Sequence, residues 1–504
     1  MVARPIAVCT LSSIAVLLIA GALASTKQAT TAVKHKASPR RPGPSSVKPP
    51  VLYTAAKHYD PFAWIHGEDR FREGATVFIR DASGQHPLVA DFAASADPSV
   101  SFDGRHVLFA GKKKAQDHWQ IWETALAERA PRRVTSCPDD CVRPFYLPED
   151  RIVYAKKSAN RFVVEAAPLA GGSTLQLTYA VGSALPTDVL RDGRILFQSM
   201  SPFGTGGLPE IYTVYSDGSG VESYRCDHGK ARYSGKQVSS GDIVFVSASG
   251  LGRFTSALAH EVRIAAPAGD YAGDVAEIPS GDWLVSWRRD ARSPFQLMRW
   301  KPVTEPNEAG VTKASAKTSA RKTNAPAKHD VRNSSASAAG DLRPVFDEPG
   351  VNILQPTLIV ERSAPNRHPS GLHDWPNANL LCLNAYTSKF KFIDGSIHSV
   401  RLYTRDTRGA AKLLGSAPVE RDGSFFIQVP TEQPLQMELL DASGKILKRQ
   451  SGWFWMRRGE QRACVGCHAG PETAPENAVP MILLKSTTPA DLTGASTHDD
   501  SGGH

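Results

Sequence analysis

Two cysteines and a histidine near the end of the chain have a spacing that supports a specific chemistry. They belong to the run Cys464-Val465-Gly466-Cys467-His468, which is a C-x-x-C-H motif. Two thiols three positions apart can form thioether bonds with the two vinyl groups of one porphyrin, and the adjacent histidine then ligates the iron. We therefore predict one covalently bound haem c, attached through Cys464 and Cys467, with His468 as the axial ligand of the haem iron.

Two other interpretations of the cysteine pair stay open: a redox or structural disulfide, and one half of a zinc site. A zinc site needs further ligands, and no second cysteine pair lies nearby in the sequence. A redox pair normally begins a helix within a βαβ unit, and the surrounding pattern predicts no such unit. Haem attachment is therefore the favoured interpretation.

The opposite face of the iron has no clear ligand in the sequence. Four residues are candidates, with Met481 put forward first: Met481, Met456, His398 and His373. Each also has an ordinary explanation as a core or surface residue, so an open coordination position is at least as well supported. The aromatic residues Trp453 and Trp455 either line the haem pocket or, as we favour, pack in a core.

Five further cysteines need a separate explanation. Cys9 lies inside an apolar stretch and is interpreted as a filler. Cys137 and Cys141 flank three residues, and a local disulfide between them is expected in an oxidising compartment. Cys226 and Cys382 are either buried thiols or partners of each other across two domains.

The N-terminus has the features of an export signal. Arg4 precedes an apolar or small stretch from Ile6 to Ala24, and small residues occupy the cleavage positions before Ser25. Residues 1–24 are thus predicted to be a cleaved signal peptide or an uncleaved anchor, with a membrane tether through residues 6–24 in the second case. Either outcome places the rest of the chain in the periplasm or another extracytoplasmic space, where haem attachment takes place.

The net charge of +9 is concentrated in two segments. Residues 25–50 contain six Lys or Arg residues and no acid, and residues 311–340 contain six with one acid. Both have few large apolar residues, which predicts a disordered spacer over 25–50 and a disordered insertion over 305–340. The remaining chain is close to neutral, so no nucleic-acid-binding face is expected.

A repeat precedes the motif. Five segments combine a polar turn with a short apolar strand, and these strands end at Phe109, Tyr154, Phe197, Phe245 and Val285. Successive ends are 45, 43, 48 and 40 residues apart, which is the length of one four-stranded propeller blade. A sixth blade is predicted from Ala75–Val89 together with Thr357–Glu361, because closure from both ends removes exposed sheet edges. We therefore expect an all-β protein with a propeller of about six blades over residues 51–362.

The pattern changes after the propeller. Strands are expected at Leu380–Tyr386, Ile397–Tyr403 and Phe425–Val429, followed by alternation at Leu435, Met437 and Leu439. Residues 363–485 are thus predicted to form a small β-sandwich-like haem domain, and residues 486–504 a disordered tail. Since only 36 residues follow His468, this sandwich must supply most of the haem pocket.

Two parts of the sequence resemble known families. The turn Ser101-Phe102-Asp103-Gly104 is similar to the repeats of TolB-like propellers. The last hundred residues resemble the middle domain of the hydrazine synthase alpha subunit, in which a propeller also comes before the C-x-x-C-H domain. The matching runs are Pro418–Phe425, Val429-Pro430, Gly452-Trp453, Gly459–Arg462, Cys464–His468 and Gly470–Glu472.

This resemblance implies a c-type haem domain, but two departures argue against hydrazine synthesis. The hydrazine-forming subunit uses a tyrosine shortly after the motif as its axial ligand and directs the motif histidine to zinc. Here no tyrosine follows His468, and Glu472 occupies the comparable region. The hydrazine-forming subunit also has a further haem domain, whereas this sequence contains one motif. Both departures favour an ordinary bond between His468 and iron.

The sequence therefore predicts an exported monohaem c-type protein, similar to the hydrazine synthase alpha subunit. Its expected role is electron transfer or small-molecule redox chemistry, together with a redox partner protein or an envelope complex. Whether it acts as a haem-dependent oxidoreductase stays open. The alternative is a propeller-based binding or scaffold module of the cell envelope with an accessory haem. A hydrolase has little support, because no nucleophile elbow or metal-binding cluster is evident.

Overall fold

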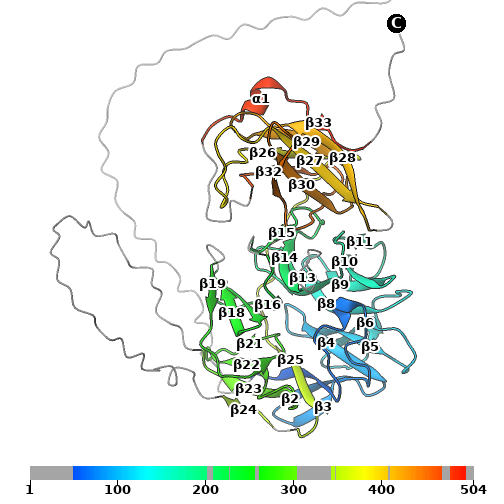
Figure 1. Ribbon diagram of the computed structural model, residues 1–504. Helices are drawn as coiled ribbons and strands as arrows, with labels where there is room; N and C mark the ends of the chain where they lie inside the picture. Colours follow the sequence, from blue (N-terminus) through cyan, green and yellow to red (C-terminus); the bar gives the residue numbers. More distant parts are fainter. Residues whose placement is uncertain are drawn as a thin grey trace, which may run out of the picture. The chain divides into compact units, whose positions relative to one another are not determined.

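The computed structural model shows a chain built almost entirely from β-strands (Figure 1), which confirms the all-β prediction. The structure describes residues 49–200, 208–225, 228–255, 260–302, 342–346, 348–406, 409–467 and 477–494. The predicted export segment, most of the basic spacer, the 305–340 insertion and the end of the tail lie outside these residues. No helix within the described ranges is long and apolar enough to cross a membrane.

Six sheets form the blades of the propeller. In the first blade, the order is β25 (Asn352–Leu358), β1 (Val51–Ala56), β2 (Thr76–Asp81) and β3 (Gly84–Pro87). The second contains β4 (Ala94–Val100), β5 (His106–Lys112), β6 (Gln120–Ala125) and β7 (Arg132–Arg133). The third contains β8 (Cys141–Leu147), β9 (Arg151–Ser158), β10 (Arg161–Pro168) and β11 (Leu175–Gln176).

The other three blades follow in chain order. The fourth contains β12 (Ala184–Val189), β13 (Ile195–Met200), β14 (Pro209–Val214) and β15 (Glu222–Ser223). The fifth contains β16 (Arg232–Gln237), β17 (Ile243–Ser247), β18 (Gly250–Phe254) and β19 (Glu261–Arg263). The sixth contains β20 (Asp270–Tyr271), β21 (Ala276–Glu277), β22 (Trp283–Arg288), β23 (Gln296–Trp300) and β24 (Arg343–Pro344). A short 3-10 turn, Trp64–His66, lies between β1 and β2.

The five predicted repeat strands are β5, β9, β13, β17 and β22, and each is the strand that follows the inner segment of its blade. A residue with positive φ occurs in the preceding turn, because the chain reverses sharply there. The residue with positive φ is a glycine in the second and fourth blades, at Gly104 and Gly193. In the third blade, Glu149 and Asp150 adopt positive φ. The shared backbone conformation explains why the polar turns recur along the sequence.

The ring closes by pairing its two ends, as predicted, although with different strands. β25 ends at Leu358 and pairs with β1, a strand that the sequence pattern did not predict. β1 is buried along nearly its whole length, so it shows none of the alternation that marks a half-exposed strand. The closing strand therefore begins at Asn352 and not at Thr357.

The C-terminal domain consists of two four-stranded sheets. One has the order β32 (Gln461–Cys464), β26 (Ala378–Cys382), β29 (Phe425–Val429) and β33 (Ala490–Asp491). The other has the order β28 (Ala411–Pro418), β27 (Ser399–Arg405), β30 (Leu435–Leu440) and β31 (Ile446–Arg449). One helical turn, α1 (Met481–Lys485), precedes β33. This arrangement agrees with the predicted sandwich-like fold, but the predicted boundary at residue 485 is wrong. β33 and the buried Leu492 lie in the segment that was predicted to be a disordered tail, because β33 pairs with β29 and Leu492 packs in the core of the sandwich.

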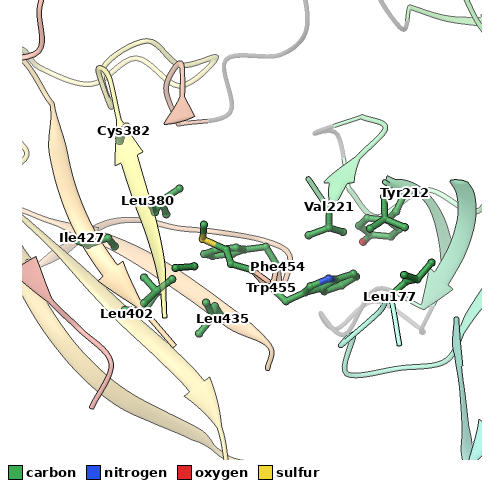
Figure 2. Packing of buried hydrophobic residues seen from close by; sticks show 14 of the residues in the cluster. Leu177, Tyr212, Val221, Leu380, Cys382, Leu402, Ile427, Leu435, Phe454 and Trp455 are labelled. Carbon is green, nitrogen blue, oxygen red and sulfur yellow. The ribbon is translucent and has the colours of Figure 1, made fainter. Parts of the chain in front are cut away.

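A single apolar cluster joins the sandwich to the third and fourth blades. Figure 2 shows the Trp455 side chain directed from its own domain toward Leu177, Tyr212 and Val221. Trp455 is 2% exposed, and its ring lies 6.2 Å from that of Phe197. A buried tryptophan contributes several kcal/mol of packing, so this contact holds the C-terminal domain against the propeller.

Polar contacts surround this apolar interface. The Arg457 guanidinium donates to the Tyr179 hydroxyl and the Gln176 carbonyl, and it forms an ion pair with Glu432 at 2.9 Å. The Gly220 amide donates to Glu460 Oε1 at 3.1 Å. The segment that leads into the cysteine motif is therefore fixed to the propeller on one side and to its own sandwich on the other.

Candidate haem attachment site

The first cysteine of the motif ends a strand that is fixed by its neighbour. β32 pairs in parallel with β26, and this register places Cys464 opposite Cys382. The Leu383 amide donates to the Cys464 carbonyl at 2.9 Å, and the Asn379 amide donates to the Glu460 carbonyl at 2.9 Å. Both ends of β32 are thus held by backbone hydrogen bonds, which sets the position of the Cys464 side chain.

The glycine between the cysteines touches a neighbouring turn. A Cβ atom at Gly466 would lie 2.1 Å from the Thr387 carbonyl oxygen and 2.8 Å from that of Asn384. These are backbone atoms, so they cannot move aside as the end of a flexible side chain would. The motif loop can therefore pack against residues 384–387 only with glycine at this position.

The two thiols are half-buried and are not in disulfides. Cys464 and Cys467 both pack against the apolar cluster of the sandwich, and Tyr386 and Phe392 pack against the same cluster. Burial raises the pKa of the Cys464 thiol, although the nearby Arg462 opposes this shift. The donor set fits a covalently attached porphyrin, because both sulfur atoms lie beside apolar side chains and retain partial exposure. His468 lies outside the described residues.

A third thiol lies beside the motif, in a position that the sequence pattern did not predict. Cys382 is 4% exposed and is not in a disulfide. Burial raises the pKa of its thiol well above the ordinary value, and the adjacent Cys464 and Cys467 add to this effect. Only the parallel pairing of β26 with β32, which are far apart in sequence, brings Cys382 here. Cys226, its suggested partner, lies outside the described residues.

The four candidate distal ligands occupy different surroundings. Met456 is fully buried in the apolar cluster against which the two motif cysteines pack. Met481 begins α1, and its amide donates to Asp422 Oδ2 at 2.7 Å. His398 is exposed just before β27, and the His373 ring stacks on that of Trp375 at 4.7 Å. Met456 is therefore the candidate that shares an environment with the cysteines.

The two tryptophans are buried, in agreement with the packing role that we favoured. Trp455 packs on the propeller as described above. Trp453 is 7% exposed, and the Arg405 guanidinium lies 4.9 Å above its ring. Both side chains lie in the segment between β31 and β32, which leads into the motif strand.

The sequence predicted no role for three charged residues before the motif, which are Arg457, Glu460 and Arg462. Glu460 is 5% exposed and accepts hydrogen bonds from the Arg457 amide at 2.8 Å and from the Arg462 side chain at 2.6 and 2.9 Å. It also accepts the propeller hydrogen bond from Gly220. Glu460 thus links the propeller directly to the strand that carries Cys464. The run Gly459–Arg462 was part of the family resemblance, which was the available signal.

A separate polar cluster lies on the propeller next to a disulfide between Cys137 and Cys141. The loop between them carries Asp139 and Asp140, whose oxygens lie 3.5 and 3.6 Å from His118 Nδ1. The Lys157 ammonium lies 3.9 and 4.0 Å from the same two carboxylates and balances part of their charge. We interpret this group as a surface ion-pair network held by the short disulfide loop.

Comparisons with known proteins agree with the architecture. Residues 392–469 match the family model described as the hydrazine synthase alpha subunit middle domain. No curated protein matches the chain. Among solved structures, Kuenenia stuttgartiensis hydrazine synthase superposes with a TM-score of 0.69 at 16% identity, over 88% of this chain and 72% of that chain. TolB from Acinetobacter baumannii matches with a TM-score of 0.36 at 14% identity, over 52% and 65% of the two chains.

The family match includes both motif cysteines and the strand β32 that ends at Cys464, whereas β26 precedes the matched range. The predicted resemblance is confirmed. The likeness to the solved synthase extends through the propeller and shows a shared fold over most of the chain. Residues 392–469 are therefore similar to the hydrazine synthase alpha subunit middle domain, within a chain whose fold resembles that of Kuenenia stuttgartiensis hydrazine synthase.

Proposed function

We propose that the chain is an exported protein with one c-type haem that transfers electrons or carries out small-molecule redox chemistry within a larger complex. The observation that carries this proposal is the geometry of the motif. The thiols of Cys464 and Cys467 are half-buried beside apolar side chains, and backbone hydrogen bonds hold the strand that ends at Cys464. When bound, haem supplies an iron that exchanges single electrons and binds small ligands if a coordination position is open.

The residues of the chain have distinct roles in this proposal. Cys464 and Cys467 form the thioether links, and His468 ligates the iron. Gly466 allows the loop to approach residues 384–387, and Glu460 fixes the preceding strand against the propeller. The apolar cluster of the sandwich excludes water from one side of the site.

Hydrazine synthesis is not part of this proposal. The similarity to the solved synthase is 16% in identity, which supports a shared fold. Glu472 stands in the region where the hydrazine-forming subunit has its ligating tyrosine. The activity that best suits the chain is therefore the general redox chemistry of a His-ligated haem c.

Optical spectra of protein matured by the c-type cytochrome machinery test this function. We expect a ferrous high-spin or weakly six-coordinate haem whose Soret band shifts when carbon monoxide binds. The His468→Ala variant should keep its thioether links but change spin state and retain haem less well. A ferrous spectrum that is fully low-spin and indifferent to carbon monoxide would instead indicate a firm sixth ligand and electron transfer alone. Matured protein without any haem spectrum would overturn the proposal.

Export is tested by cell fractionation of the full chain. Recovery from the periplasm with Ser25 as the first residue would support a cleaved signal peptide. Recovery from the membrane fraction with an intact N-terminus would support an anchor through residues 6–24. Retention in the cytoplasm would contradict both, because haem attachment to this motif is expected after export.

A further inference from the structure

Exposed apolar side chains are concentrated in the C-terminal domain and the segment before it. Among the described residues, seven large apolar side chains are exposed, and all follow the last propeller strand: Trp375, Phe390, Ile393, Leu413, Ile446, Val479 and Leu484. None of these seven side chains therefore belongs to the described part of the propeller. Exposed apolar groups of this kind often mark interaction sites.

Two of these side chains lie in one lysine-rich loop. Phe390 is 45% exposed and Ile393 is 81% exposed, and Lys389 and Lys391 are exposed on either side of Phe390. The Lys448 ammonium from β31 lies 3.2 Å from the centroid of the Phe390 ring. We call Lys389, Phe390, Lys391, Ile393 and Lys448 the Phe390 patch.

The Phe390 patch adjoins the cysteine motif. Its loop begins at Thr387, whose carbonyl oxygen is the atom that leaves no space for a side chain at Gly466. Burial lowers the pKa of Lys448, and the nearby Cys467 thiol opposes this shift. A porphyrin attached to Cys467 would therefore lie close to this patch.

The charge of the patch indicates its partner. The Phe390 patch contains three lysines, two from the loop and Lys448 from β31, whereas the loop contains one exposed acid, Asp394. Small apolar areas bordered by charge are typical of transient electron-transfer interfaces, in which complementary charge steers the encounter and accelerates association. We propose that the Phe390 patch is the docking surface for an electron-transfer protein with an acidic surface around its own redox centre. This inference rests on the proposed haem function.

Reduction kinetics of the matured ferric protein test this docking surface. The first reductant is reduced flavodoxin, an acidic protein, and the second is reduced riboflavin, a small molecule that has no docking surface of its own. At low ionic strength, we expect the triple variant K389E/K391E/K448E to react roughly tenfold more slowly with flavodoxin, because association loses its steering. Its reaction with riboflavin should be unchanged. Added salt should slow the flavodoxin reaction of the unmodified protein, since screening weakens the attraction.

The matched control is Lys412→Glu, which makes one Lys-to-Glu change, a third of the charge change of the triple variant, at an exposed position on β28. We expect this variant to keep the rate of the unmodified protein to within twofold with both reductants. The docking surface would be overturned if the triple variant reacted with flavodoxin as fast as the unmodified protein. It would also be overturned if Lys412→Glu slowed this reaction as much, per substituted lysine, as the triple variant does. A matured protein with no haem spectrum before mixing would instead overturn the proposed function, and this inference with it.

Discussion

Gly466 determines how closely the motif loop approaches the rest of its domain. The nearest atoms to a Cβ at this position belong to the backbone of residues 384–387, at distances that no real side chain shows. An added methyl group must displace either the loop or the turn. Because the loop carries Cys467, such a displacement changes the separation of the two thiols.

The substitution Gly466→Ala is therefore expected to destabilise the domain by about 1–3 kcal/mol, as overpacking of a tight site does. It should also lower the ratio of haem absorbance to protein after maturation. The matched control is Gly371→Ala, because a Cβ at Gly371 meets nothing within 4 Å. Urea unfolding and haem quantification measure both effects. Equal stability and equal haem content in the two variants would contradict the role assigned to Gly466.

The buried thiols predict a pH dependence in the haem-free protein. Burial raises the pKa of Cys464 and raises that of Cys382 further above the ordinary value, so each carries less thiolate at a given pH than an exposed cysteine. Since the thiolate is the reactive form, alkylation of both should be slower at neutral pH than that of an exposed cysteine, and its rate should rise with pH. Iodoacetamide labelling followed by peptide mass spectrometry measures this, with Cys382 the slowest. Rapid labelling of Cys464 at pH 7 would contradict the raised pKa of its thiol.

At the scale of elements, the inner strands of the propeller are joined by a buried charged group. The Arg143 guanidinium on β8 donates to Asp274 at 3.0 and 3.1 Å, and the Arg143 amide donates to Asp97 Oδ2 on β4 at 3.0 Å. Gln355 on the closing strand β25 donates to Asp97 and accepts from Thr54 on β1. Burial works against ionisation of Asp274, but Arg143 nevertheless holds the pKa of its carboxyl below the ordinary value.

Replacing Arg143 by methionine is expected to destabilise the propeller by about 3–5 kcal/mol, because the carboxylate of Asp274 then loses its buried partner. Adding Asp274→Asn to this variant should recover part of the loss by removing the remaining charge. The exposed control Arg289→Met should change stability by no more than about 0.5 kcal/mol. Urea denaturation compares the variants, and an Arg143→Met protein as stable as the control would refute this account of the inner strands.

The sequence could predict the elements whose pattern is local. The repeated turns located β5, β9, β13, β17 and β22, because each turn needs an unusual backbone conformation next to an apolar strand. β1 was missed because a strand buried on both faces shows no alternation. The pairing of β26 with β32, which brings Cys382 to the motif, joins segments about 80 residues apart and leaves no local signal. The spacing of Cys464 and Cys467 could be recognised in the sequence. The contacts of Glu460 and Gly466 could not be predicted, because their partners are far away in the sequence.

At the scale of the whole molecule, the two domains share one apolar cluster, in which the Trp455 ring contacts the rings of Tyr179 and Phe197 on the propeller. Replacing Trp455 by alanine is expected to cost about 3–5 kcal/mol and to separate the unfolding of the sandwich from that of the propeller. Differential scanning calorimetry should then show two transitions in place of one. Trp375→Ala is the matched control, since Trp375 is 51% exposed. Its thermogram should match that of the unmodified protein, and a single unshifted transition in Trp455→Ala would contradict the coupling.

The central claim concerns the covalent bond between haem and the two motif cysteines, and peptide mass mapping tests it most directly. Trypsin cleaves after Arg462 and Lys485, so one peptide, Ala463–Lys485, contains both Cys464 and Cys467. In protein exported and matured with the c-type machinery, this peptide is expected to carry the mass of one haem and to resist alkylation at both cysteines. Recovery of the same peptide at its unmodified mass, with both thiols open to alkylation after competent maturation, would contradict the account.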